Sequence, residues 1–428
     1  TPGKAFDSNW HPLVFVLVIP PVVWFVNKYV VPYYHKNKII SVYSYLESKL
    51  GAWARIYAAL SFVLYMIGRA AVILYLAGLL LSYFVPWNIV GVILVIGTIT
   101  IIYTLLGGME AVVWTDVMQS VIMIFGILCC AVFLTIEVFS KPDFLISSAL
   151  EANKFSLGSW KLSLSERTIW VMIIYGVSEM LRDFLGDQNY VQKYASVSTV
   201  KEATRSIWLS MLIYIPLTAV FLYIGTTLFA FYSGSEHVLG EAITKGDQVF
   251  PYFIATELPV GLRGLIVAAI VAAAMSTVDS ALNCSATVLF LDFYKRYFKP
   301  QVGERESMIF LRTSTAVWGL LGTGFTLMMI QAQSALDIWW QISGIFGGGI
   351  LGLFILAMLN ARLKVWQGLV SIGASIVIIS WGIFVRDLPA GWQWLQCDIE
   401  EIIIGAFGTV ALLVVAFLFH FRNKGKAV

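Results

Sequence analysis

The chain has 428 residues, of which 59% are hydrophobic and 12% are charged. A soluble globular domain carries about 25% charged residues, so this chain has about half the usual share. Its apolar residues come in blocks of about 20 or more, a length that crosses a bilayer as a helix. The composition therefore predicts an all-α polytopic membrane protein. It excludes a soluble enzyme, a nucleic-acid-binding domain and a disordered chain, and the net charge of +3 adds little.

Eleven apolar segments are expected to span the membrane. In chain order they are residues 12–34, 56–84, 88–106, 113–139, 168–186, 206–231, 264–290, 309–332, 338–360, 367–385 and 401–421. Two longer connections, about 140–167 and 232–263, each hold a weakly amphipathic stretch that we expect along the membrane surface. No linker, charge block or legible repeat divides the chain, so we expect a single transmembrane domain over residues 1–428.

Lysines and arginines predict the orientation of these spans, because cytoplasmic loops are enriched in both. If Thr1 lies outside, the inner loops hold 17 of the 28 basic residues, the outer loops hold eight, and three fall within spans. We therefore expect a multi-pass protein of the cell membrane, with its N-terminus outside and its C-terminus in the cytoplasm.

Arg69 lies in the middle of the second span. Charge inside a bilayer is costly, so an ionisable group at this depth is a functional hypothesis by default. Its planar guanidinium requires a carboxylate, and that partner is either an acid on a neighbouring helix or a bound solute. The residues alone leave both possibilities open.

The fifth span carries Glu179, Arg182, Asp183 and Asp187. Spacings of three, four and eight place most of this set on one helical face, which therefore lines a cavity or contacts another helix rather than lipid. The spacing of three also favours an internal ion pair between Glu179 and Arg182.

The seventh span holds a stripe of small and weakly polar side chains, namely Ala273, Ser276, Thr277, Ser280 and Cys284. Such stripes usually indicate close helix packing, and Ser and Thr also bond to the carbonyl four residues back. The alternative is functional: adjacent hydroxyls beside backbone carbonyls offer the hard oxygen ligands that an alkali cation prefers.

Asp116 lies one turn inside the fourth span, next to the hydroxyl of Thr115. It is either a carboxylate that caps the helix N-terminus or an anionic ligand that a cation meets on its way to the cytoplasm.

The ninth span contains the glycine run Gly347-Gly348-Gly349 and follows Trp339-Trp340-Gln341. The glycines permit a kink or a close helix contact, and packing is the commoner cause. The aromatic pair and the amide could face a polar ligand.

Histidines, cysteines and carboxylates match no spacing of a transition-metal site and suggest no nucleophile paired with a base. No phosphate-binding glycine loop is present that could drive transport with ATP. We therefore expect a protein that is not an enzyme, has no cofactor, and has no nucleic-acid or obligate protein partner.

Several motifs resemble the sodium/solute symporter family. They are Gly107-Gly108 followed by Trp114-Thr115-Asp116 and Gln119, Asp187-Gln188 with Gln192-Lys193-Tyr194, Ser276–Asn283, and Asp292–Lys295. Residues Lys4 to Arg69 look most like the sialic-acid and sugar branches of that family. The motifs occur in the family's order and extend over nearly the whole chain.

The resemblance implies a LeuT-type fold of two five-helix inverted repeats around a site at the midplane. In that comparison the first span matches the second core helix, so we expect a fragment that lacks the first core helix and one helix before it. The resemblance places the main sodium site at the Ala273 carbonyl, Ser276 and Thr277. Asp116 matches an aspartate associated with a second cation site or with sodium exit.

The resemblance also implies a solute site. Arg69 matches the arginine that engages the solute carboxylate in the sialic-acid branch, while Glu179, Asp183, Trp340 and Gln341 map near positions that line the sugar site. Val16 departs from the pattern, because the sialic-acid branch has a polar side chain there.

Together these features predict a sodium-coupled symporter that imports a small polar solute (a sugar, sialic acid or another carboxylate) by alternating access. Sodium is the coupling ion, and the partners are the solute and the lipid bilayer. The alternatives are a sensor or scaffold that keeps the fold without transport, and an intramembrane enzyme, for which no catalytic pair is found.

Overall fold

The structure is a computed structural model and describes residues 1–36, 41–106, 109–139, 145–191, 197–233, 239–240, 243–331, 334–361, 363–386 and 392–424. Every predicted span coincides with helix in this part of the chain. The first span is a helical segment made of α2 (His11–Leu17), α3 (Ile19–Phe25), η1 (Val26–Val30) and α4 (Val31–Lys36). Pro20 and Pro21 lie in the first turn of α3, where their missing N–H groups cost little.

The other predicted spans follow in chain order as α6 (Ala52–Leu81), α7 (Ile89–Leu106), α8 (Met109–Phe139), α10 (Ile169–Gly186), α12 (Val200–Ser233), α14 (Val260–Val288) with η2 (Leu289–Phe298), α15 (Glu304–Met328) with η3 (Met329–Gln331), α16 (Ala335–Met358), α17 (Val365–Phe384) and α18 (Ile404–Lys424). Among the described residues, nine helical segments are long and apolar enough to cross a membrane. The two remaining predicted spans are the shorter helix α7 and the charged helix α10.

Short helices connect the spans. They are α1 (Pro2–Asp7), α5 (Val42–Leu50), α9 (Leu145–Glu151), α13 (Gly246–Thr256), η4 (Gln393–Leu395) and η5 (Glu401–Ile403). The helices α9 and α13 lie in the two connections for which a surface helix was expected, and α13 packs against α1 and α6.

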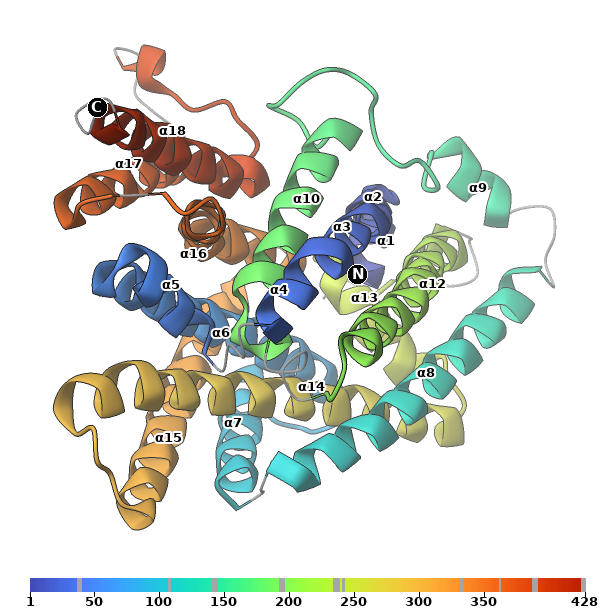
Figure 1. The fold of residues 1–428 in the computed structure, drawn as a ribbon. Coiled ribbons are helices and arrows are strands. Elements are labelled where there is room, and N and C mark those ends of the chain that lie inside the picture. Colours follow the sequence, from blue (N-terminus) through green and yellow to red (C-terminus); the bar gives the residue numbers. More distant parts are fainter. Residues whose placement is uncertain are drawn as a thin grey trace.

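The core of the molecule forms around α6, which packs against α14, α15 and α16. Next to this group, α10 contacts α16 on one side and α2 on the other, so that it lies near the centre of the bundle (Figure 1). The helices α17 and α18 pair at one side, and α8 and α12 lie at the other. Charged α10 is therefore enclosed by helices rather than exposed to lipid.

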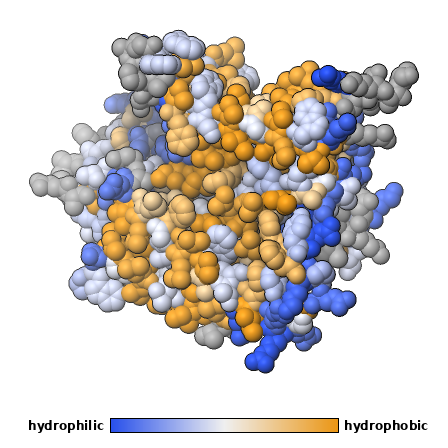
Figure 2. Space-filling view, turned by 90° about the vertical axis from the view of Figure 1, so that its left-hand side faces the viewer, coloured by the Kyte–Doolittle hydropathy of each residue, from blue (hydrophilic) through white to orange (hydrophobic). Residues whose placement is uncertain are grey.

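Many large apolar side chains are exposed on the described helices, as expected of helices that face a bilayer. On the face shown in Figure 2, apolar side chains cover most of the surface and strongly hydrophilic ones gather toward its edges. The exposed apolar side chains include Leu94, Ile99, Phe125, Leu212 and Leu320. This distribution inverts the pattern of a soluble protein.

Candidate functional site

A cavity of about 620 Å³ lies among α2, α3, α6, α10, α12 and α16. Four of the five predicted solute residues line it, namely Arg69, Glu179, Asp183 and Trp340. Val16, the residue that departs from the sialic-acid branch, also lines it. The second, fifth and ninth predicted spans thus supply one shared cavity, although they are far apart in the sequence.

Arg69 projects into this cavity from the middle of α6. Within the described ranges its guanidinium forms no hydrogen bond or ion pair, and its electrostatic partners are Tyr65 on the same helix and Asp187, Tyr190 and Asp183. A guanidinium inside a helical bundle is strongly stabilised by a bidentate anion. Of the two kinds of partner that the sequence leaves open, a fixed carboxylate in direct contact with Arg69 is not found among the described residues.

Arg182, in contrast, is neutralised locally. Its Nη2 donates to Glu179 Oε1 and to Asp183 Oδ1, each at 2.5 Å. The guanidinium also lies 4.0 Å from the centre of the Tyr65 ring. The ion pair with Glu179 that the spacing favours is present. Glu179 additionally accepts a hydrogen bond from Ser343 on α16.

The aromatic residues Trp339 and Trp340 line the cavity from the first turns of α16, which Ser334 caps through its side chain. Trp340 is 3% exposed and packs edge-on against His11 and at a tilt against Tyr175. Gln341 lies outside the described cavity wall and donates instead to Glu401 of η5.

A polar stripe on α12 was not singled out in the sequence. Ser206, Ser210, Tyr214 and Thr218 all line the cavity. Their regular spacing of four residues on the sixth span places them on one helical face, and this signal was available in the sequence. The stripe extends the polar wall beyond the predicted residues.

The predicted sodium ligands lie together on α14. Thr277 Oγ1 donates to the Ala273 carbonyl oxygen at 2.9 Å, the internal bond that hydroxyls commonly form in helices. Ala273, Ser276 and Thr277 are all half-buried, and none is among the described residues that line the solute cavity. Carbonyl and hydroxyl oxygens fit an alkali cation, so the donor set suits sodium.

Some predicted features lie outside the described residues. The backbone of Asp116 belongs to α8, but its side chain lies beyond the described part, as do Gly107-Gly108 and Gln192-Lys193-Tyr194. Among the described residues, no group of three His, Cys, Asp or Glu side chains could hold a metal ion.

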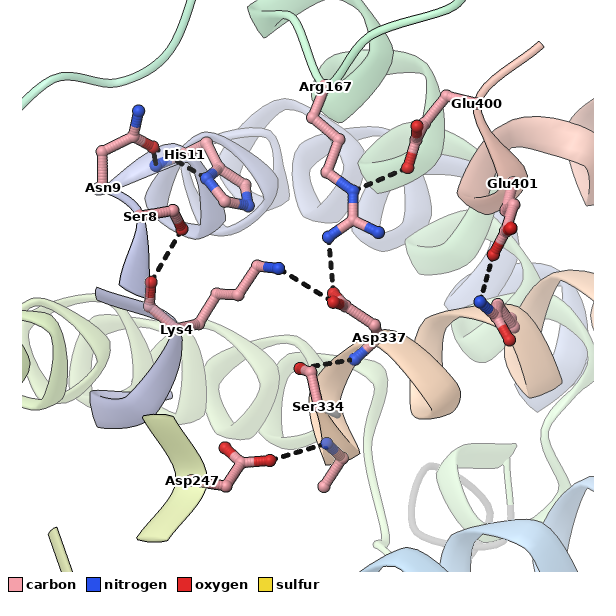
Figure 3. Close-up of polar contacts among 12 residues, drawn as sticks. Lys4, Ser8, Asn9, His11, Arg167, Asp247, Ser334, Asp337, Glu400 and Glu401 are labelled. Carbon is pink, nitrogen blue, oxygen red and sulfur yellow. Dashed lines mark hydrogen bonds and ion pairs between the residues drawn. The ribbon is translucent and has the colours of Figure 1, made fainter. Parts of the chain in front are cut away.

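A chain of ion pairs joins α1 and α16 to the segments just before α10 and η5 (Figure 3). Asp337 on α16 pairs with Lys4 of α1 at 2.8 Å and with Arg167 at 2.5 Å. Arg167 also pairs with Glu400 at 2.6 Å, and its guanidinium lies 5.6 Å from the Trp340 ring centre. Burial opposes the charge on Arg167, but Asp337 and Glu400 outweigh that effect and raise its pKa. We call these four charged residues the outer network.

Membrane-crossing helices around an internal cavity with buried charges define a multi-pass membrane transporter of small solutes. The chain belongs to the sodium:solute symporter family, whose family model matches residues 1–379. It is therefore a sodium-coupled symporter, and the predicted family is confirmed.

Two curated relatives are sodium/sialic acid symporters. NanT of Aliivibrio fischeri is 32% identical, with 97% of this chain and 81% of the relative covered. SiaT of Proteus mirabilis is 30% identical, with 90% and 78% covered. Sodium-coupled monocarboxylate transporter 2 of Bos taurus is more distant, at 25% identity over 92% of this chain and 64% of its own length.

Solved structures confirm the expected fold. A Na+-coupled sialic acid symporter in a substrate-bound, outward-open state matches with a TM-score of 0.84 at 28% identity, over 97% of this chain and 84% of that one. Mhp1, a nucleobase-cation-symport-1 family transporter, matches with a TM-score of 0.61 at 15% identity, over 100% and 88% of the two chains. The architecture is therefore the LeuT-type fold.

Proposed function

We propose that this symporter imports a solute that carries a carboxylate, with sialic acid or a similar acidic sugar as the best candidate. The observation that carries the proposal is Arg69, a guanidinium that lines the cavity without an ion pair to any described residue. An anionic solute would supply the missing bidentate partner. The names of the sodium/sialic acid symporter relatives point in the same direction.

The remaining wall of the cavity suits the hydroxyl-rich part of such a solute. Glu179 and Asp183 offer acceptor oxygens that Arg182 holds in place, and Trp340 offers an apolar ring face. An acidic sugar matches all three features of the cavity: its carboxylate suits Arg69, its hydroxyls suit the acceptor oxygens, and its apolar ring face suits Trp340. Gln341 bonds to Glu401 in this structure and would have to give up that bond to contact the solute.

Sodium binds on α14 in this proposal, at the Ala273 carbonyl, Ser276 and Thr277, and Asp116 assists a second cation or sodium exit. The bound ion favours one arrangement of the helices, solute then binds, and alternating access releases both on the cytoplasmic side. The chain works as one transmembrane domain with a cytoplasmic C-terminus, without enzymatic activity, a cofactor or an obligate protein partner.

The sodium assignment is tested by binding of labelled sialic acid to purified protein across a sodium titration. Replacing Ser276 and Thr277 together with Ala should abolish the sodium dependence, because two oxygen ligands are lost. Ser285→Ala is a matched control, since Ser285 lies on the same helix and bonds back to the Ala281 carbonyl at 2.8 Å. If the double variant keeps the wild-type sodium dependence, the sodium site is elsewhere.

A further inference from the structure

Asp187, the C-cap of α10, is a buried acid to which no role has been assigned so far. Its side chain is 3% exposed. Oδ1 accepts a hydrogen bond from the Asn189 backbone N–H at 2.8 Å. Oδ2 is also buried and has no hydrogen-bond partner among the residues that the structure describes. A carboxylate oxygen in this state is costly unless a positive charge or a proton compensates it.

The charges around Asp187 do not balance. Three carboxylates of α10 (Glu179, Asp183 and Asp187) face two guanidiniums, and Arg182 already pairs with the first two of these acids. Arg69 is thus the remaining cation for Asp187, with which it interacts electrostatically without a direct ion pair. This cluster carries one negative charge more than it has positive charges.

Titratable groups face Asp187 from each neighbouring element. They are Glu179, Arg182 and Asp183 on α10, Arg69 on α6, Tyr43 on α5, and Tyr190 just after α10. Among them only the two arginines are cationic. Arg182 is held at 2.5 Å by two acids, so any change in the availability of Arg69 acts directly on Asp187.

An anionic solute at Arg69 would change that availability. Building on the proposed function, we propose that Asp187 takes up a proton when a carboxylate solute binds Arg69, so that the solute enters the membrane together with a proton as well as sodium. The solute carboxylate takes over the positive charge of Arg69 and leaves Asp187 without a counter-charge. A proton on Oδ2 returns the cluster to its solute-free charge, and it neutralises the buried oxygen of Asp187 that has no partner among the described residues.

Linkage gives the direction of the effect. If solute binding raises proton affinity at Asp187, protonation must raise solute affinity by the same factor. Solute therefore binds more tightly as pH falls, and its affinity changes by up to about tenfold per pH unit in the range where Asp187 is protonated in the complex but ionised in the solute-free protein. An uncharged solute should show no such dependence, because it leaves Arg69 available to Asp187.

The test uses infrared difference spectroscopy and binding measurements on the purified full chain, with sialic acid as the probe. Adding sialic acid at neutral pH should produce the absorption of a protonated carboxyl group. In solute-free protein the same band should grow as the pH is lowered from about 8 to about 5. Both signals should be missing in Asp187→Asn and retained in Asp398→Asn, a matched change at an exposed acid.

Binding calorimetry on the wild-type protein provides a test that needs no variant. Sialic acid should bind with uptake of about one proton, seen as a dependence of the binding heat on the ionisation heat of the buffer. The methyl ester of sialic acid, which is neutral, should bind without proton uptake. Equal proton uptake for both ligands, or pH-independent affinity for sialic acid, would overturn the proposal.

The outcomes separate this inference from the proposed function. If sialic acid binds through Arg69 without a band that Asp187→Asn removes, the solute assignment stands and the proton site is wrong. If sialic acid does not bind at any pH, the solute assignment fails. The pH titration of solute-free protein then decides on Asp187 by itself, since a band that the Asn variant retains excludes it as a proton site.

Discussion

At the scale of single residues, the two arginines in the membrane differ in what compensates their charge. Arg182 is held by Glu179 and Asp183 of its own helix, whereas Arg69 lines the cavity with no ion pair in the described part of the chain. A guanidinium held by two fixed acids has little capacity left for a solute, whereas one without a direct ion pair can bind an anion that reaches it. This contrast separates a structural arginine from one available to a solute.

Arg69→Lys should weaken the binding of a carboxylate solute by about 1.5–3 kcal/mol, since lysine keeps the charge but loses the bidentate geometry. Equilibrium binding of labelled sialic acid measures the loss. The fold should remain intact, because no ion pair of the described structure is removed. An unchanged affinity would show that the solute carboxylate binds elsewhere.

Residue-level prediction succeeded where a contact lies within one helix. The spacing of three between Glu179 and Arg182 predicts their ion pair, and the pair forms. It was incomplete where contacts join helices: Trp340 lines the cavity, while its neighbour Gln341 bonds to Glu401. Trp339 and Trp340 share the cavity wall, whereas Gln341 lies about 200° around the helix from Trp339 and faces η5.

At the scale of helices, the glycines of α16 permit close packing. A Cβ on Gly347 would lie 2.5 Å from Cδ of Arg182, and one on Gly348 would collide with the backbone of Gly405 on α18. Of the two explanations for the glycine run, a kink or a close helix contact, the close contact is therefore correct for these two positions. Glycine here brings α10 and α18 close enough to α16 to hold the charged face of α10.

Gly348→Ala should lower the free energy of unfolding by about 1–3 kcal/mol, because the two backbones would have to separate. Gly373→Ala on α17 is the control, since a Cβ there meets nothing within 4 Å. Thermal unfolding of the purified proteins in detergent compares the two. Equal melting temperatures would show that the contact between α16 and α18 tolerates an added carbon.

The outer network joins α16 to α1 and to the segments that contain Arg167 and Glu400. Its residues are far apart in the sequence, so no pattern within one predicted span indicates these contacts. Asp337→Asn would leave Lys4 and Arg167 without their shared carboxylate (Figure 3). The expected cost is about 1–3 kcal/mol, because the group is half-buried. Thermal unfolding tests this, with Glu306→Gln as the control, which changes only an exposed carboxylate that Lys299 and the Tyr294 hydroxyl contact. Equal losses in both variants would contradict a stabilising role for the outer network.

At the scale of the whole molecule, the sequence predicted the membrane class, the spans and the family. Blocks of apolar residues determine where helices cross a bilayer, and such blocks are visible in the chain itself. The cavity was harder to predict, because its wall combines α2, α3, α6, α10, α12 and α16. The polar stripe on α12 is an example. Its spacing of four residues can be read from the sequence, but the helices that it faces across the cavity are determined by tertiary packing.

The membrane potential makes one sodium ion per cycle a sufficient driving force for uptake of a neutral solute. One charge moved inward at a potential of 100 mV supplies about 2.3 kcal/mol, whereas a tenfold solute gradient costs about 1.4 kcal/mol. One sodium ion can therefore concentrate a neutral solute more than tenfold. A singly charged anionic solute cancels this electrical gain, because one sodium ion and one anion together move no net charge, and an accompanying proton would restore it.

The central claim is that a sodium gradient drives a carboxylate solute through the cavity that Arg69 lines. The most direct test is uptake of labelled sialic acid into proteoliposomes with an inward sodium gradient. The account predicts accumulation above the external concentration, which collapses when an ionophore dissipates the gradient and is absent with Arg69→Ala. Equal uptake with potassium in place of sodium, or accumulation that persists in Arg69→Ala, would contradict it.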